Sequence, residues 1–208
     1  MKNEMPKSSN VVWNTSSVSL AAREKKLKYT IHVFWFTGLS GAGKSTLTVN
    51  LERLLFEKGI MVARLDGDNI RYGLNGDLGF SEDDRTENIR RIGHVSKLFY
   101  DHGIITLCSF VSPFRKDRDF VRKLFPTGRF HEIYTACTIA ECIKRDPKGL
   151  YKKALAGIIQ GYTGISSPYE EPLAPELVLH TDENSLENNI ESIYAYIIDT
   201  IIQTGKER

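Results

Sequence analysis

A glycine-rich segment between an apolar run and a helical pattern constrains the fold more than any other feature of the sequence. Residues 38–45 read Gly-Leu-Ser-Gly-Ala-Gly-Lys-Ser and match the pattern G-x-x-x-x-G-K-[ST] in full. The β-branched and aromatic run at 31–37 predicts a buried strand before it, and leucines at helical spacing in 45–58 predict a helix after it. A strand, a glycine-rich turn and a helix in this order are typical of a loop whose backbone N–H groups bind phosphate.

Two side chains of this loop have distinct expected roles. Lys44 would neutralise charge on the β- and γ-phosphates of a nucleotide, and the Ser45 hydroxyl would coordinate Mg²⁺. The alternative is a glycine-rich turn with an exposed lysine, which the strand and helix on either side disfavour. The predicted ATP-binding residues are Gly38, Leu39, Ser40, Gly41, Ala42, Gly43, Lys44, Ser45, Thr46 and, much later in the chain, Arg145.

The rest of the chain alternates between strand and helix patterns. Apolar runs predict strands at 60–65, 104–110, 130–135 and 176–180, and helical periodicity predicts helices at 81–102, 116–125, 140–145 and from 186 onward. Such alternation implies an α/β fold, a parallel sheet with helices on both faces. The length of 208 residues suits one domain at 31–208, and residues 1–30, which lack sustained periodicity, are expected to form an N-terminal extension.

Composition excludes several classes of partner. Lys and Arg total 28 against 26 Asp and Glu, so the chain lacks the basic excess of a nucleic-acid-coating surface. Its apolar runs are far shorter than the ~20 residues of a membrane span, and residues 1–10 are too polar for a secretory signal. Three cysteines without a C-x-x-C pair suggest free thiols. We therefore expect a soluble, cytoplasmic protein with neither a nucleic-acid nor a membrane partner.

Charged residues outside the loop indicate where an acceptor would bind. Asp66 and Asp68 follow the second strand, where a carboxylate can hold Mg²⁺ or orient an acceptor hydroxyl, although the alternative is an ordinary Asp-Gly turn. A basic cluster that could bind an anionic acceptor comprises Arg71, Arg85, Asn88, Arg90 and Arg91. The alternative for this cluster is a solvated helix face paired with neighbouring acidic residues.

A second basic segment lies late in the chain. Residues 144–153 carry four lysines and one arginine around a Pro-Lys-Gly hinge. Such a segment suits a lid that closes on a triphosphate and excludes water, and the alternative is a solvated basic loop.

Taken together, these segments resemble the adenylylsulfate kinase (APS kinase) family. The matching stretches, in order, are residues 35–46, 66–71, 73–75, 78–81, 84–91, 109–115, 145–153, 162–165 and 168–170. Residues 10–13, Asn-Val-Val-Trp, are similar to the family's N-terminal tag. The resemblance covers nearly the whole chain and is far more specific than the phosphate loop alone.

The resemblance implies a function and a fold. The family transfers the γ-phosphate of ATP to the 3′-hydroxyl of adenosine 5′-phosphosulfate (APS), which yields ADP and 3′-phosphoadenosine 5′-phosphosulfate (PAPS). The implied fold is of the P-loop NTPase type, nucleoside-kinase-like, with a lid at about 144–170. Mg²⁺ and a homodimeric assembly are also implied. A kinase for another nucleotide-like acceptor and a nucleotide-sensing module without transferase activity remain the alternatives.

The resemblance also assigns roles to individual residues. Phe80 and Tyr162 would stack on the adenine of the acceptor, while Arg71, Arg85 and Asn88 would hold its phosphosulfate and sugar. Ser112 matches the serine that is assigned in the family as a phosphoserine intermediate, but direct in-line transfer is favoured on physical grounds. The predicted catalytic residues are Lys44, Asp66 and Ser112. The predicted substrate-binding residues are Asp66, Asp68, Arg71, Phe80, Arg85, Asn88, Val111, Ser112, Lys148, Leu150 and Tyr162.

Overall fold

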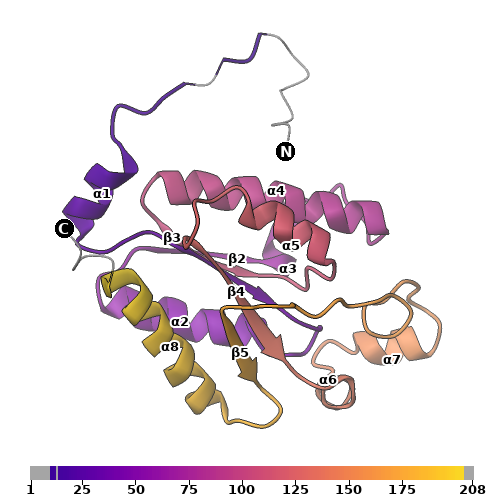
Figure 1. Cartoon of the computed structure of the whole chain (residues 1–208). Coiled ribbons are helices and arrows are strands. Elements are labelled where there is room, and N and C mark those ends of the chain that lie inside the picture. Colours follow the sequence, from indigo (N-terminus) through magenta and orange to yellow (C-terminus); the bar gives the residue numbers. More distant parts are fainter. Residues whose placement is uncertain (1–9, 13, 204–208) are drawn as a thin grey trace.

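Five parallel strands form one sheet that is covered by helices (Figure 1). The structure is a computed structural model and describes residues 10–12 and 14–203. The spatial order of the strands is β2-β3-β1-β4-β5. The strands are β1 (Val33–Thr37), β2 (Val62–Asp66), β3 (Ile105–Ser109), β4 (Phe130–Ala136) and β5 (Leu177–His180). The predicted parallel α/β sheet is confirmed, with strand ends that differ from the predicted ones by one or two residues.

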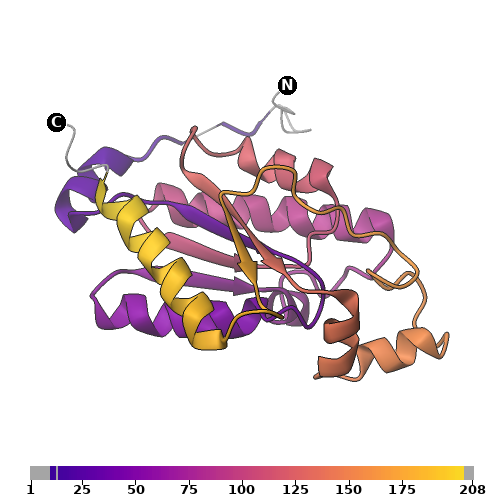
Figure 2. The same cartoon turned by 60° about the horizontal axis from the view of Figure 1, so that its bottom comes forward.

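Helices cover both faces of this sheet. Figures 1 and 2 show α2 (Lys44–Glu57) and α8 (Leu186–Gln203) on one face, and α4 (Glu82–Asp101) and α5 (Arg115–Arg122) on the other. The central strand β1 is buried along its whole length, as its unbroken apolar sequence requires. Phe34 packs edge-on against Tyr196 of α8, and Trp35 packs against Phe110 and Phe130. One core therefore lies on each side of β1.

The longest predicted helix begins where its capping signal places it. The Ser81 hydroxyl accepts a hydrogen bond from the Asp84 N–H, and the Asp84 carboxylate accepts one from the Ser81 N–H, so the capping box is complete with Asp in place of Glu. The pattern at Asp66-Gly-Asp68 also caps a helix: the Asp66 carboxylate accepts from the Asp68 N–H at 3.1 Å. Helix α3 (Gly67–Tyr72) begins there, and no periodic pattern predicted it.

Short helices lie at the two ends of the sheet. Helices α6 (Ile139–Arg145) and α7 (Leu150–Leu155) project from the carboxyl edge, and only α6 was predicted. Helix α1 (Leu20–Leu27) lies at the opposite end beside the end of α8, within the predicted extension (Figures 1 and 2). Glu24 of α1 pairs with Arg129 at 3.1 Å and accepts a hydrogen bond from the Ile31 N–H at 2.9 Å.

Parts of two predictions fall outside the described residues, namely the polar start of the chain at residues 1–9 and Trp13 of the N-terminal tag. Across the described helices, none combines the length and the apolar character needed to cross a bilayer.

A chain of buried polar side chains links β1 and β4 at the end of the sheet away from the phosphate loop. The Arg129 guanidinium donates to His32 Nε2 at 3.2 Å, which places the proton of that imidazole on Nδ1. His32 Nδ1 then donates to His131 Nε2 at 2.9 Å, and His131 Nδ1 donates to the Tyr196 hydroxyl at 2.8 Å. Burial lowers the pKa of His32 to about 3 and also lowers that of His131.

The lowered pKa values of His32 and His131 predict that the protein loses stability on acidification. The pKa values of both histidines in the folded protein lie below the unfolded value of about 6.5. The neutral histidines therefore stabilise the fold fully above that pH, and this stabilisation is lost as the pH falls towards 3. Going from about pH 7 to about pH 5 should lower the free energy of unfolding by roughly 2 kcal/mol through His32 alone. Denaturant unfolding at the two pH values measures this loss. His32→Gln, which cannot titrate, should lose clearly less; an equal loss would contradict the assignment.

Candidate active site

A cleft of about 810 Å³ opens at the carboxyl edge of the sheet, between the phosphate loop, α3, the start of α4, the segment after β3 and the lid. The sequence-predicted residues that line it are Ser40, Gly41, Gly43, Lys44, Ser45, Thr46, Asp66, Asp68, Arg71, Phe80, Arg85, Asn88, Val111, Ser112, Arg145, Lys148, Leu150 and Tyr162. The other predicted residues, Gly38, Leu39 and Ala42, belong to the same loop but do not line the cleft. Residues predicted from distant segments therefore meet at one site.

Close backbone contacts fix the course of the phosphate loop. Gly38 begins it directly against β4, where a Cβ would lie 2.5 Å from the Thr135 carbonyl oxygen, so any larger residue would collide with the backbone. Gly41 has a φ of +80° and lies beside Cys142 of α6, with room for only a strained side chain. The loop is thus clamped between β4 and α6 before it enters α2.

Lys44 is held inside the loop that precedes it. Its ammonium donates to the carbonyl oxygens of Gly38 at 2.8 Å and Leu39 at 2.7 Å, and the side chain is buried. Burial lowers its pKa to about 8. The cation therefore lies at the point where the loop would place phosphate oxygens, and an anion bound there would favour its protonated form.

Ser45, the next residue of α2, faces the carboxylate of Asp66 at the end of β2. The Ser45 hydroxyl donates to Asp66 Oδ2 at 2.6 Å, and Arg64 lies 3.7 Å from the same oxygen. A hydroxyl and a carboxylate oxygen side by side are the hard oxygen donors that suit Mg²⁺. The chemistry of this donor set fits the predicted ion.

The four arginines of the predicted basic cluster divide into two pairs with different environments. Arg90 and Arg91 both pair with Glu87, at 2.6 and 2.8 Å, as the alternative of a solvated helix face expected. Among the described residues, Arg71 and Arg85 form hydrogen bonds to carbonyl and hydroxyl oxygens and no ion pair, and burial lowers the pKa of both guanidinium groups. Both cations line the cleft, and no carboxylate of the described residues forms an ion pair with them, so their charge is available to an anionic ligand.

Backbone contacts orient these two arginines. The Arg71 guanidinium lies 4.4 Å from the centre of the Phe80 ring and donates to the Gly79 carbonyl at 2.8 Å. Arg85 donates to the Phe80 carbonyl at 2.9 Å and reaches across to Gly161 and Thr163 of the lid. Phe80 itself is two-thirds exposed. A flat apolar surface with a cation above it is a platform on which an aromatic base can stack.

Ser112 lies on the cleft wall, but its hydroxyl is engaged in the core. The Trp35 Nε1–H donates to Ser112 Oγ at 3.1 Å, and Oγ in turn donates to Thr37 Oγ1 at 3.0 Å. The residue is buried and has a φ of +39°, and Arg118 donates to its carbonyl at 2.6 Å. In the described structure neither a carboxylate nor an imidazole contacts this hydroxyl, so no base is positioned to activate it.

The lid is attached to the phosphate loop through residues that sequence reasoning did not single out. The Tyr151 hydroxyl of α7 donates to the Ser40 carbonyl at 2.8 Å, and its ring packs edge-on against Tyr162. Asp146 accepts hydrogen bonds from the N–H groups of Tyr151 and Lys152, which begins α7. Lys148 forms an ion pair with Asp68 across the cleft mouth.

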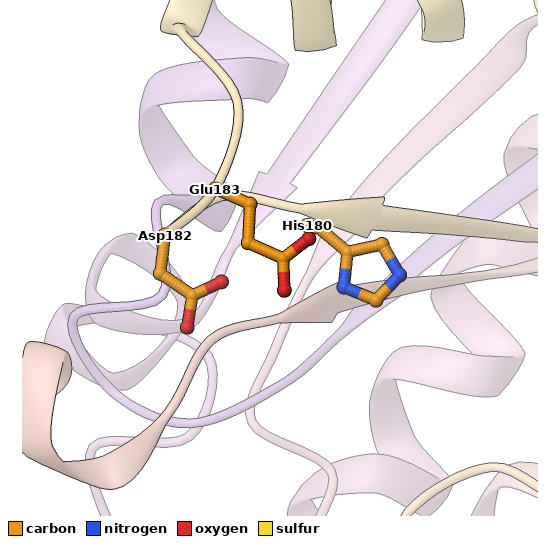
Figure 3. A group of neighbouring side chains, drawn as sticks. All are labelled: His180, Asp182 and Glu183. Atoms are coloured by element: carbon orange, nitrogen blue, oxygen red, sulfur yellow. The ribbon is translucent and has the colours of Figure 1, made fainter.

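Thr181, which sequence reasoning also missed, follows the end of β5. The Thr181 hydroxyl donates to the Ala42 carbonyl at 2.9 Å, and the Thr181 carbonyl accepts from Arg145 at 2.6 Å. Beside it, His180, Asp182 and Glu183 bring possible metal-binding atoms within 4.8 Å of one another (Figure 3). Asp182 already accepts from the Thr138 N–H at 2.7 Å, and none of the three lines the cleft, so this group is separate from the candidate active site.

Comparison with known proteins identifies the family. Residues 30–180 match the family model for adenylylsulphate kinase. The chain belongs to the adenylylsulfate kinase family. It is 57% identical over 188 residues to a probable adenylyl-sulfate kinase of Halalkalibacterium halodurans, covering 90% of this chain and 93% of that one. It is 54% identical over 195 residues to the adenylyl-sulfate kinase of Staphylococcus carnosus, covering 94% and 98%.

Solved structures of the adenylylsulfate kinase family share the fold. The APS kinase CysC of Mycobacterium tuberculosis, in complex with AMPPNP and APS, is 44% identical and superposes with a TM-score of 0.75 over 82% of this chain and 97% of that one. The resemblance found in the sequence is thereby confirmed, and so is the predicted type of α/β fold.

The environment of Lys44 predicts that nucleotide binding is coupled to proton uptake. With a pKa of about 8, the free ammonium is about half protonated at pH 8, and a bound phosphate favours the charged form. ADP should therefore bind with uptake of up to about half a proton at pH 8, and its affinity should fall as the pH rises through 8. Calorimetric titration in two buffers of different ionisation enthalpy measures the uptake. Lys44→Arg, which stays charged, should bind without this uptake; the same uptake in both proteins would contradict the assignment.

Proposed function

We propose that the protein is an ATP-dependent kinase that phosphorylates the 3′-hydroxyl of APS and releases PAPS and ADP. The observation that carries this proposal is the arrangement of one cleft with two anion-binding ends. At one end lies a complete phosphate loop, and at the other lie Arg71 and Arg85 beside the exposed ring of Phe80. The curated relatives that match nearly the whole chain are named adenylyl-sulfate kinases, which supports the same acceptor.

On the donor side, the loop N–H groups and Lys44 would hold the β- and γ-phosphates. Ser45 and Asp66 would hold Mg²⁺, whose chemistry is to neutralise charge on the phosphate oxygens as it develops. Arg145, fixed by Thr181, would lie beside the nucleotide. Because little covalent chemistry is required of the protein in phosphoryl transfer, positioning and charge neutralisation supply most of the rate.

On the acceptor side, Phe80 and Tyr162 would stack on the adenine, and Arg71, Arg85 and Asn88 would bind the phosphosulfate and the sugar. The Val111 backbone, Lys148 and Leu150 complete this wall. Asp66 and Asp68 would lie near the acceptor hydroxyl, which would give its proton to one of these carboxylates. The lid at 144–170 would close over both substrates and exclude water.

Transfer would proceed directly between the two substrates, without a phosphoserine. The Ser112 hydroxyl already accepts from Trp35 and donates to Thr37, so its role would be to shape the acceptor wall. The homodimeric assembly, the cytoplasmic location and the division into an extension at 1–30 and one kinase domain at 31–208 stay predictions.

The proposal is tested by supplying the purified protein with ATP, Mg²⁺ and APS and following ADP by a coupled assay, with APS omitted in the control. Lys44→Ala should lower kcat/KM by at least about a hundredfold because a buried charge that faces the transferred phosphate is lost. Lys58→Ala, at the exposed end of the same helix, should leave turnover unchanged. Rapid turnover of another nucleotide acceptor with none of APS would reject the acceptor but not the kinase chemistry.

Ser112→Ala separates direct transfer from a covalent intermediate. We expect turnover to fall by no more than about tenfold, and the free energy of unfolding by about 1–3 kcal/mol, because the buried Trp35 N–H loses its acceptor. Steady-state kinetics and thermal unfolding measure the two effects. Intact-mass spectra of the wild-type protein after exposure to ATP should show no phosphorylated form. A trapped phosphoserine, together with loss of nearly all turnover in the variant, would establish the covalent route instead.

A further inference from the structure

We propose that Asn75 is a positioning residue that fixes the side-chain amide of Asn88 so that its N–H₂ group, and not its oxygen, faces the acceptor in the cleft. The two amides form the last links of a chain of hydrogen bonds that begins at Arg91. The inference deepens the proposed function and rests on it, because the ligand of Asn88 is taken to be the anionic nucleotide acceptor.

Arg91 determines which groups donate and which accept in this series of hydrogen bonds. Its guanidinium makes two parallel hydrogen bonds to the Asp77 carboxylate, at 2.7 and 2.9 Å, and a third to Glu87 at 2.8 Å. Such a fork–fork pair holds the guanidinium plane in one orientation. Arginine has donors only, so every group that this side chain faces must present an acceptor.

Asn75 is fully buried between Arg91 and Asn88. Arg91 points a guanidinium N–H at Asn75 Oδ1 from 3.5 Å, and Asn75 Nδ2 donates to Asn88 Oδ1 at 3.0 Å. The two ends of an amide have nearly the same shape, so their partners decide which way the group is turned. In the reverse orientation the Asn75 N–H₂ group would face the arginine cation, two donors in contact. The Arg91 charge therefore selects the orientation of Asn75.

The backbone around Asn75 keeps it in place. Its N–H donates to the Ile70 carbonyl of α3 at 2.9 Å, and its carbonyl accepts from the Leu78 N–H at 3.1 Å. The residue is thereby fixed in the connection between α3 and α4, behind the wall of the cleft. Asn75 does not itself line the cleft.

Asn88 is the residue through which Asn75 would act on the ligand. It lies in the second turn of α4, lines the cleft and is 5% exposed. Because its oxygen accepts from Asn75, its two N–H donors are left, and the structure gives them no partner among the described residues. The nitrogen is open to the cleft, since it is not one of the buried polar atoms that lack a partner, so a ligand oxygen can reach it. A hydroxyl or anionic oxygen of the acceptor is such a group, and the neighbouring Arg71 and Arg85 also present donors only.

The nearly isosteric substitution Asn75→Asp tests the series of hydrogen bonds from Arg91 through Asn75 to Asn88. A carboxylate can accept from Arg91 but cannot donate to Asn88, so the Asn88 amide must turn and present its oxygen to the acceptor. We expect the KM for APS to rise about tenfold or more, the equivalent of one lost hydrogen bond and a new unpaired acceptor. The KM for ATP should stay within about twofold. Asn188→Asp, the same change on the exposed surface of α8, should leave both KM values unchanged.

A double-mutant cycle distinguishes positioning from general damage to the fold. In an Asn88→Ala background, Asn75→Asp should change the KM for APS by less than about twofold, because the group through which it acts is gone. An equal rise in both backgrounds, or an equal rise in the KM for ATP, would overturn the proposal. If thermal unfolding shows that Asn75→Asp does not fold, Asn75→Ala takes its place, with a smaller rise that must also vanish in the Asn88→Ala background.

The same assays separate this proposal from the one on which it rests. A wild-type protein that does not turn over APS would reject the proposed function, and with it the role of Asn75 and Asn88 in binding the acceptor. A wild-type protein that turns over APS, with a KM insensitive to Asn75→Asp, would reject the positioning role alone.

Discussion

The rest of the site depends on the close approach of the phosphate loop to β4. Gly38 leaves the central strand at a point where even a methyl group would collide with the Thr135 carbonyl, so only glycine allows the loop to follow this path. That path brings two loop carbonyls onto the Lys44 ammonium and aims the start of α2 into the cleft. Because the loop N–H groups and the helix dipole then point the same way, an anion-binding site forms before any ligand arrives.

The arginines of α3 and α4 have two kinds of partner. Arg90 and Arg91 are held by carboxylates, whereas Arg71 and Arg85 are held by backbone carbonyls and carry no ion pair among the described residues. Carbonyl partners orient a guanidinium without neutralising it, so the positive charge stays available to a ligand. The near-zero net charge of the chain hides this arrangement, since an average over the whole sequence cannot show which cations are already paired.

Periodicity and capping signals predicted the parts of this fold that local sequence controls. The strands are unbroken apolar runs because both faces of the sheet are covered, and α4 follows from its capping box and its apolar stripe. Helices α1, α3 and α7 have only six to eight residues and were not predicted, and tertiary contacts stabilise them. The ion pair of α1, for example, joins Glu24 to Arg129. Motif residues of the site were predictable, whereas Asn75, Tyr151 and Thr181 act through partners that only the fold brings near.

Arg118 shows how such long-range contacts join the acceptor wall to the lid. The side chain is almost fully buried, and its charge is balanced by Glu132 of β4 at 2.5 Å. It also donates to the carbonyl oxygens of Ser112 at 2.6 Å and Glu170 at 2.7 Å. A buried cation that loses any of these partners is strongly destabilised, so the contacts hold together as a unit. Arg118 thereby joins Glu170, at the end of the lid, to Ser112 of the acceptor wall and to Glu132 of β4.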